Sequence, residues 1–469
     1  MFILLLGVVG LILGYVVYSR YVERIFLPFK EPTPAVKIND GVDYVPMPTW
    51  KDSMIQLLNI AGTGPIFGAL MGAKWGPIVF LWIIFGTILG GAVHDYMSGM
   101  MSVREDGASI TSVISKYIGK WTRYPILILV VFLMIMVSAT FARSASDLLV
   151  SLTDIPVWIW MGFILFYFML STLLPIDKVI GRIYPVFGVL LIVMALTIIG
   201  GLVIGGYEFP SITFENLNPD KAAVLPDMFI TVACGAISGF HATQSPMVSR
   251  CISDERSGRT VFYGAMAIEA VIALVWATAG LAFYGNTTDL AAALTTSGAS
   301  GTVYEISSTV AGPVGGVLAV LGVIVCPITS GDTALRAARL MIEDDRHVTK
   351  NKKRIAFMIT LVMMLFIILL CSLDFTVLWN YFSWLNQTLA AIVLWTATIF
   401  IMRSMENKWY SVITMVPAMF MTVVVSSFIL HSKLGLNLDY ELSVMLGVLL
   451  SVVAFVFYLR AFLKFINKE

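Results

Sequence analysis

The sequence predicts an all-α polytopic membrane protein with about 13 transmembrane helices. Hydrophobic residues make up 58% of the 469 residues and charged residues only 13%, about half of the roughly 25% that is usual in soluble domains. The mean hydropathy is +0.89. The apolar residues form continuous runs of about 20, the length of a membrane-spanning helix, without the alternation of a membrane β-barrel. A water-soluble globule is therefore excluded.

Thirteen runs qualify as spans, and each predicts one helix. In order, they are residues 1–18, 54–72, 76–101, 124–149, 156–174, 182–205, 224–246, 259–284, 305–329, 354–371, 375–402, 409–430 and 440–464. The run at 1–18 has no basic segment before it and no small-residue cleavage site, so we expect a retained span rather than a signal peptide. The segments 206–223 and 285–304 have turn character and predict small caps.

The positive charges predict the orientation of these spans. All but four of the 30 Lys and Arg residues lie in segments that follow odd-numbered spans. Of the four, Lys74, Lys221 and Lys433 follow even-numbered spans and Arg143 lies inside a span. Because cytoplasmic loops attract Lys and Arg, we expect an outside N-terminus and a cytoplasmic C-terminus. The net charge of +1 argues against a nucleic-acid partner.

Spans two and seven contain residues that interrupt a helix. Span two carries NIAGTGPIFG and span seven carries TVACGAISGFHATQSP. Glycine and proline weaken a helix interior, and freed backbone groups must be buried or line a polar cavity. The alternative for each motif is a kink that allows close helix packing.

The two interrupted spans are five spans apart, which predicts an inverted repeat. An odd number of spans returns the chain to the opposite side of the membrane, and interrupted helices at corresponding positions indicate a midplane substrate site. The predicted organisation is an N-terminal helix at 1–18, five-helix repeats at 54–205 and 224–402, and a C-terminal helix pair at 409–464. The candidate substrate-binding residues are Gly62, Thr63, Gly64, Pro65, Gly235, Ser238, Gly239, His241 and Arg143.

Charged residues inside a membrane are costly and usually functional. His241 in span seven is the first candidate for a titrating group at the site, with a hydrogen bond to the interrupted backbone as the alternative. Glu269 and Asp95 are candidates for ion coupling, with structural pairing as the alternative for each. Arg143 either binds a substrate carboxylate or pairs with Asp147 one helical turn away.

Several motifs resemble the carbon starvation protein A family of bacterial inner-membrane transporters. They are PTPAVKINDGVDYVP, NIAGTGPIFG, GGAVHDYMSGMMSVREDGASI, CGAISGFH and ITSGDTALRAARL, which together lie between residues 33 and 340. The resemblance implies uptake of peptides or of small carboxylates such as pyruvate during carbon starvation. It also implies the amino acid–polyamine–cation superfamily, with a LeuT-type five-plus-five repeat. One departure is Gln56-Leu57-Leu58, where family members often carry His-His-Phe.

The LeuT-type resemblance also implies an ion site. Hydroxyls of Thr329 and Ser330, near the predicted cytoplasmic end of span nine, would join carbonyls around Ala61 and Gly62, with Asp332 nearby. Oxygen ligands of this kind suit a hard cation. The alternative is a helix C-terminal turn broken at Gly331.

The predicted function is secondary active transport driven by a proton or sodium gradient. A channel and a nutrient sensor of the same architecture are the alternatives, and no motif of a membrane-embedded enzyme is present. The expected partners are a small-molecule substrate and the lipid bilayer. No cofactor is expected apart from the transported ion, and the oligomeric state stays open.

Overall fold

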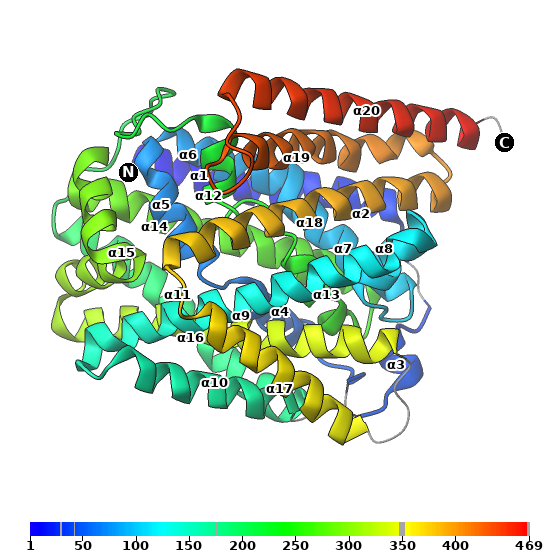
Figure 1. The fold of residues 1–469 in the computed structure, drawn as a ribbon, viewed down its shortest axis with the longest axis horizontal. Coiled ribbons are helices and arrows are strands. Elements are labelled where there is room, and N and C mark those ends of the chain that lie inside the picture. The colour runs from blue at the N-terminus through cyan, green and yellow to red at the C-terminus, as the bar shows by residue number, and fades with distance from the viewer. Residues whose placement is uncertain (29–30, 42, 174–175, 347–351, 467–469) are drawn as a thin grey trace.

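The structure is a computed structural model that describes residues 1–28, 31–41, 43–173, 176–346 and 352–466. Within these ranges the chain is helical without a β-strand, and one isolated parallel bridge joins Met47 to Ile252. Most of the long helices lie side by side along one direction, with the two termini near opposite ends of the molecule (Figure 1).

The α-helices account for most of the described chain. They are α1 Phe2–Leu13, α2 Ser19–Phe26, α3 Pro34–Ile38, α4 Thr49–Ile60, α5 Ala69–Gly72, α6 Ile78–Leu81, α7 Ala92–Arg104, α8 Ile110–Tyr117, α9 Arg123–Thr153, α10 Val157–Leu173, α11 Ile176–Ile204, α12 Phe229–Thr231, α13 His241–Ser249, α14 Ala265–Tyr284, α15 Thr287–Val310, α16 Gly312–Asp345, α17 Lys352–Leu370, α18 Phe375–Ser404, α19 Val412–His431 and α20 Tyr440–Ile466. Short π-helical or 3-10 turns join several of them into longer helical stretches.

An all-helical protein that crosses the membrane many times is confirmed. Ten helical stretches in the described residues are long and apolar enough to span a bilayer, and a bent pair, Thr49–Ile60 with Gly64–Trp75, makes up to eleven. The helix α10 is apolar but shorter, at 17 residues. Length and composition therefore support ten or eleven spans among the described residues, and the exact count of 13 stays a prediction.

The predicted bounds of span nine were wrong. Residues 305–329 do not form one helix, because α15 ends at Val310 and α16 runs from Gly312 to Asp345. The segment predicted as a cap at 285–304 lies mostly in α15, which bends at Gly298, where φ is +66°. Gly331 does not end a helix. As a result, Thr329 and its neighbours lie in the middle of α16 rather than near the end of a helix, where the sequence predicted them.

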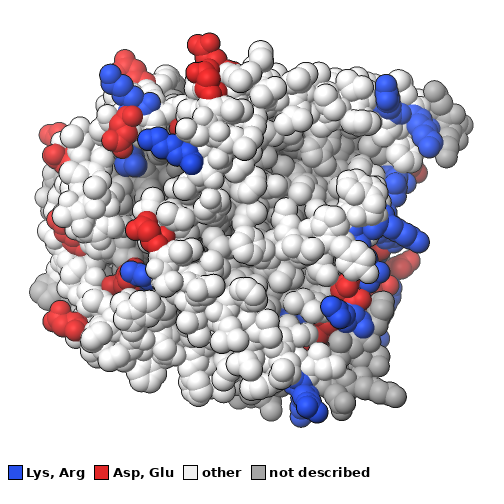
Figure 2. All heavy atoms as spheres, in the orientation of Figure 1, with Lys and Arg blue, Asp and Glu red and all other residues white. Residues whose placement is uncertain are grey.

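Charged residues lie mainly at the two ends of the molecule, as expected if the helices between the ends span a membrane. Figure 2 shows Lys and Arg gathered at the end where α3 and α8 lie, and Asp and Glu more frequent at the opposite end. A broad band of uncharged surface lies between them. Large apolar side chains are exposed there, such as Phe163 at 64% and Leu365 at 62%. This band has the character of a lipid-facing surface.

Candidate transport site

Both predicted helix interruptions are present. In the first, α4 ends at Ile60 and helical structure resumes at Gly64, with a bend of 58° between the two parts. In the second, α12 ends at Thr231 and α13 begins at His241, with a non-helical segment between them. These residues are buried, so the freed backbone groups meet protein rather than lipid.

The two breaks touch each other at Gly64. A Cβ atom built on Gly64 would lie 2.1 Å from the Cβ of Cys234, so no larger residue fits without movement. Beside this contact, the Cα of Pro65 is 3.7 Å from the Cβ position of Gly235. Further along the second break, the N–H of Gly239 donates to the carbonyl of Asn386 at 3.2 Å. The glycines of both motifs therefore allow one break to pack directly on the other.

The helix α18 holds the second break at both ends. Oδ1 of Asn386 accepts hydrogen bonds from the backbone N–H of Phe240 at 2.6 Å and from the hydroxyl of Ser238 at 3.1 Å. The neighbouring Gln387 donates through Nε2 to the carbonyl of Phe229, in α12, at 3.1 Å. Freed backbone groups that would otherwise be orphaned thus find partners on α18. From the sequence alone, Asn386 and Gln387 are uncharged polar residues deep in an apolar span, which favours a role in bonding helices together over contact with substrate. The hydrogen bonds to the second break agree with that interpretation.

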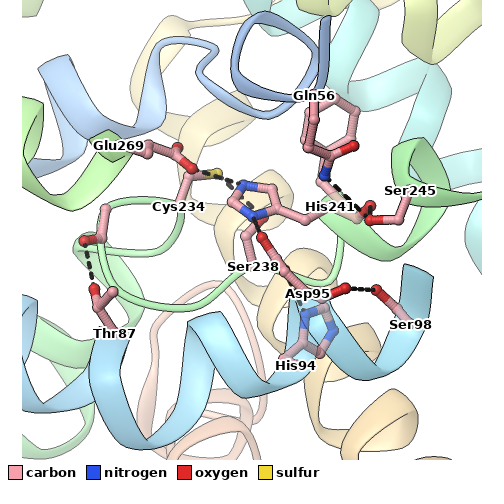
Figure 3. A network of polar contacts seen from close by, with 12 residues as sticks. Gln56, Thr87, His94, Asp95, Ser98, Cys234, Ser238, His241, Ser245 and Glu269 are labelled. Atoms are coloured by element: carbon pink, nitrogen blue, oxygen red, sulfur yellow. Dashed lines mark hydrogen bonds and ion pairs between the residues drawn. The ribbon is translucent and has the colours of Figure 1, made fainter. Parts of the chain in front are cut away.

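A histidine lies between two carboxyl groups at the start of α13 (Figure 3). Nδ1 of His241 is 2.8 Å from Oδ2 of Asp95 in α7, and Nε2 is 3.5 Å from Oε2 of Glu269 in α14. The other oxygen of Asp95 is 2.8 Å from Nδ1 of His94. All four side chains have no solvent exposure. We call His241, Asp95 and Glu269 the acid–histidine cluster. It unites three titratable groups from three helices, and such a chain can hold or pass a proton.

Several buried polar atoms around the breaks have no hydrogen-bond partner within the part of the chain that the structure describes. They include both carboxyl oxygens of Glu269, Oγ1 of Thr63, Oδ1 of Asn59, Oε1 of Gln56 and Nε2 of His94. A buried polar group without a partner costs about 1–3 kcal/mol. Near the breaks, these atoms are the groups available to a bound polar molecule or proton.

An aromatic side chain from α9 fills the space beside the first break. A Cβ atom built on Gly62 would lie 2.3 Å from the ring of Phe141, so the ring rests directly on the backbone there. The same ring makes edge contacts with Phe240 of the second break, at a centroid distance of 6.0 Å, and with Phe382 of α18, at 5.8 Å. Phe141 is fully buried. The space between the breaks and α9 is thus closed in this conformation.

The hydroxyls of α16 reach the first broken helix at a different carbonyl from the one expected. Ser330 donates to the carbonyl of Leu58 at 2.9 Å, and Thr329 lies 3.3 Å from the same oxygen. The expected carbonyls were those around Ala61 and Gly62. The contact still joins the middle of α16 to the end of α4, so the two hydroxyls hold the first break much as Asn386 holds the second.

Asp332 is directed toward α10 and α11 rather than toward the breaks. Its carboxyl oxygens accept hydrogen bonds from the hydroxyls of Ser171 at 2.6 Å and Tyr184 at 2.9 Å. Arg336, one turn further along α16, also bonds to the carbonyl of Ser171. This buried network ties α16 to its neighbours, away from the acid–histidine cluster.

Arg143 is not placed at the breaks either. Its Nε lies 3.1 Å from Oδ1 of Asp147 on the same helix, and its Nη1 donates to the carbonyl of Cys371 at 3.3 Å. Its side chain is 26% exposed. The structure therefore has the pairing with Asp147 that was the alternative interpretation.

The Lys- and Arg-rich end of the second broken helix is covered. Arg250, just after α13, donates to the carbonyl of Gly107 at 2.9 Å and pairs with Asp344 at 3.3 Å. Its guanidinium lies 5.2 Å from the ring centre of Tyr44, whose hydroxyl donates to the carbonyl of Asp106. Burial raises the pKa of Tyr44, so this hydroxyl stays a neutral donor. These contacts close the end of α13 from that side.

The sequence identified most of the residues that meet here but not their partners. His241, Asp95 and Glu269 were predicted separately, and the structure brings them together with the glycines of both breaks. Phe141 was missed, because one aromatic residue in an apolar helix carries no distinguishing signal. Asn386 was singled out together with Gln387, since an Asn-Gln pair is conspicuous in a largely apolar helix.

Comparison with known proteins places these features in a family. The model of the family described as "Carbon starvation protein CstA" matches residues 1–216 and 159–311. An uncharacterized membrane protein of Haemophilus influenzae is 40% identical over 331 residues, which cover 59% of this chain and 89% of that protein. The relatives with named activities are transporters rather than enzymes.

Two of these relatives are substantially longer than this chain. The pyruvate/proton symporter BtsT of Escherichia coli is 26% identical over 341 residues, covering 56% of this chain and 46% of the symporter. The peptide transporter CstA of Helicobacter pylori strain J99 is 27% identical over 332 residues, covering 56% of this chain and 48% of the transporter. This chain thus spans about half the length of these named relatives.

Solved structures agree on the fold. A manganese transporter of Eremococcus coleocola, in complex with an aromatic bis-isothiourea compound, superimposes with a TM-score of 0.58 at 12% identity, over 92% of this chain and 98% of the transporter. At that identity the likeness concerns the fold alone. The motifs of the two breaks and the match of the family model over residues 1–311 lead to one conclusion: this chain belongs to the carbon starvation protein CstA family.

Proposed function

We propose that this chain is a proton-coupled secondary transporter that imports small carboxylates such as pyruvate, or short peptides, by alternating access. One observation carries the proposal: the two helix breaks are in contact, and the buried acid–histidine cluster lies at the start of the second. The names of the pyruvate/proton symporter and of the peptide transporter support the substrate classes. Because the chain spans about half their length, the substrate is proposed rather than carried over.

The proposed organisation is a LeuT-type inverted repeat. Residues 54–205 and 224–402 would form the two five-helix repeats, with 1–18 and 409–464 outside them. The break that follows α4 and the break between α12 and α13, each near the start of its repeat, support this arrangement. Interrupted helices in corresponding positions of two halves are typical of a midplane substrate site.

The proposed substrate site lies between the breaks and α9, where Phe141 now rests. Thr63, Gly64 and Ser238 would contribute backbone and hydroxyl groups, and the freed N–H groups of the breaks suit a carboxylate. For the substrate to enter, the ring of Phe141 must move away from Gly62. Arg143 has no place in this site, because it pairs with Asp147.

Proton coupling would depend on the acid–histidine cluster. An unpaired charge buried in the membrane is costly. Gain or loss of one proton among Asp95, His241 and Glu269 would therefore change how strongly the three helices that carry them attract one another. Binding a proton on one side of the membrane and releasing it on the other would link that change to substrate movement. Sodium is the alternative ion, and Thr329 and Ser330 would be its candidate ligands.

The proposed orientation has the N-terminus outside and the C-terminus in the cytoplasm of a bacterium, with the protein in the inner membrane. The gathering of Lys and Arg at the end of the molecule that carries α3 and α8 supports it (Figure 2), because positive residues are retained on the cytoplasmic side.

Reconstituted uptake tests the proposal. Purified protein in liposomes is given labelled pyruvate or a labelled dipeptide, with a proton gradient and a sodium gradient imposed separately. We expect accumulation above equilibrium under the proton gradient. The variant Glu269→Gln should lose accumulation and retain exchange of labelled for unlabelled substrate. Glutamine keeps the shape of the side chain but cannot bind or release a proton. Glu305→Gln is the matched control, because Glu305 is exposed and accepts a hydrogen bond from Tyr284 outside the acid–histidine cluster.

Each contrary outcome removes a different part of the proposal. Accumulation by Glu269→Gln at the rate of the unmodified protein would show that Glu269 of the acid–histidine cluster does not couple proton movement to transport. Accumulation under the sodium gradient alone would show that the coupling ion is sodium and not the proton. Downhill flux without accumulation would indicate a channel, and binding without any flux would indicate a sensor.

A further inference from the structure

Two cavities meet at the Lys- and Arg-rich end of α9, away from the proposed transport site. The first, of about 610 Å³, lies between α8, the start of α9 and the end of α16. The second, of about 760 Å³, lies between α9, the end of α16 and α17. Tyr124, Leu127 and Asp345 line both, so the two cavities adjoin at these side chains.

The first cavity is polar and carries a positive excess. Lys116, Lys120 and Arg123 line it, together with Asp344 and Asp345. Two of the cations already have acidic partners, since Lys116 pairs with Glu105 outside the cavity and Arg123 pairs with Asp345 at 2.6 Å. Lys120 is exposed and forms no ion pair with any described residue.

Hydroxyl groups complete the polar wall. Ser112 and Ser115 lie in α8, on the side that faces the cavity, and Thr111 lies beside them. Hydroxyl and ammonium groups together are the donors that bind phosphate oxygens in proteins. The first cavity therefore has the chemistry of a site for a phosphate-bearing group.

The second cavity is an apolar groove open to the lipid side. Its walls include Ile128, which is 69% exposed, Phe132 at 47% and Phe366 at 54%. It extends along α9 from Tyr124 to Ile135, a distance of roughly 16 Å at 1.5 Å per residue. A groove of that length and character matches a hydrocarbon chain better than a polar solute.

The junction of the two cavities lies at the depth of a membrane surface. Trp121 and Tyr124 flank it and are 76% and 64% exposed. Exposed Trp and Tyr are enriched where the hydrocarbon meets the headgroups. The polar cavity is thus at headgroup level, and the groove runs from it into the hydrocarbon.

We propose that this cavity pair binds an anionic phospholipid, with the phosphate near Lys120 and one acyl chain in the groove along α9. Basic pockets between spanning helices on the cytoplasmic side are suited to such headgroups. The excess of cations favours a headgroup with net negative charge over a zwitterionic one. The bound lipid would bridge α8, α9 and α17, whichever substrate the protein carries.

Lipid binding by the purified full chain in detergent tests this proposal. Retention of labelled phosphatidylglycerol is compared with that of phosphatidylcholine, and glycerol 3-phosphate is added as a soluble competitor. We expect phosphatidylglycerol to be preferred and glycerol 3-phosphate to compete poorly, because it lacks the chain. The variant Lys120→Gln should weaken phosphatidylglycerol binding by about fivefold, the effect of one basic residue at a membrane surface. Lys37→Gln, also exposed but outside both cavities, is the matched control.

A second variant tests the groove separately from the charge. Val131→Trp should fill the groove and weaken binding of both lipids without changing any charge. Equal retention of the two lipids, unchanged by Lys120→Gln, would overturn the proposal. Competition by glycerol 3-phosphate as strong as that by the lipid would also overturn it, since a free phosphate group would then suffice. None of these measurements depends on transport.

Discussion

The contact between α18 and the second helix break makes a quantitative prediction about Asn386. In Asn386→Ala, the backbone N–H of Phe240 loses its acceptor at 2.6 Å and remains buried, which costs about 1–3 kcal/mol. Loss of the hydrogen bond from Ser238 adds about 1 kcal/mol. We therefore expect the free energy of unfolding to fall by about 2–4 kcal/mol, a large effect for one substitution.

The measurement is thermal unfolding in mild detergent followed by tryptophan fluorescence, with uptake in liposomes beside it. Thr388→Ala is the matched control, because among the described residues its hydroxyl bonds only to the carbonyl of Trp384 in the same helix, and alanine favours a helix. We expect this control to change stability by less than about 0.5 kcal/mol. If Asn386→Ala is as stable as Thr388→Ala and transports equally well, α18 does not hold the break, and the reasoning fails.

Three further substitutions probe separate contacts of the candidate site. Gly64→Ala places a Cβ 2.1 Å from that of Cys234, so unfolding should become easier by about 1–3 kcal/mol. Adding Cys234→Gly should restore part of the stability, and no recovery in thermal unfolding would contradict the direct contact. Arg143→Gln should leave KM for uptake unchanged. It should lower the free energy of unfolding by at most about 1 kcal/mol, because a partly exposed pair with Asp147 contributes little. A tenfold rise in KM would place Arg143 at the substrate. Ser330→Ala should lower the free energy of unfolding by about 1 kcal/mol, because the hydrogen bond to the first broken helix is lost. Proton-driven uptake should stay within twofold of the unmodified protein. A gain or loss of sodium dependence would instead indicate an ion site at Ser330.

The sequence predicted the class of fold and both interruptions because each depends on local chemistry. Long apolar runs must be helices in a membrane, and glycines clustered with a proline weaken a helix interior. The course of α16 was not predictable in this way. The apolar run was predicted to end at residue 329, and a turn broken at Gly331 was one interpretation, but the helix continues to Asp345. Pro327 lies inside it, and neighbouring helices can satisfy backbone groups that a proline frees.

The partners of the titratable residues were beyond prediction for a different reason. His241 and Asp95 are 146 residues apart, and no pattern within either helix indicates that α13 and α7 face each other. Arg143 shows the complementary case: its partner Asp147 is one turn away, so spacing alone was enough to propose the pair. Local pairs can therefore be predicted from one sequence, whereas a site assembled from several helices requires the tertiary arrangement.

The second break is held on two sides by contacts of different kinds, and this has a mechanistic consequence. On α18, Asn386 and Gln387 bond to it through neutral amides, whose hydrogen bonds do not change with protonation. On α7 and α14, Asp95 and Glu269 hold His241 through groups that titrate. Under the proposed mechanism, arrival or departure of a proton alters only the second set of contacts. The start of α13 would then move relative to α7 and α14 while its attachment to α18 is kept, so Asn386 is the expected pivot of the motion.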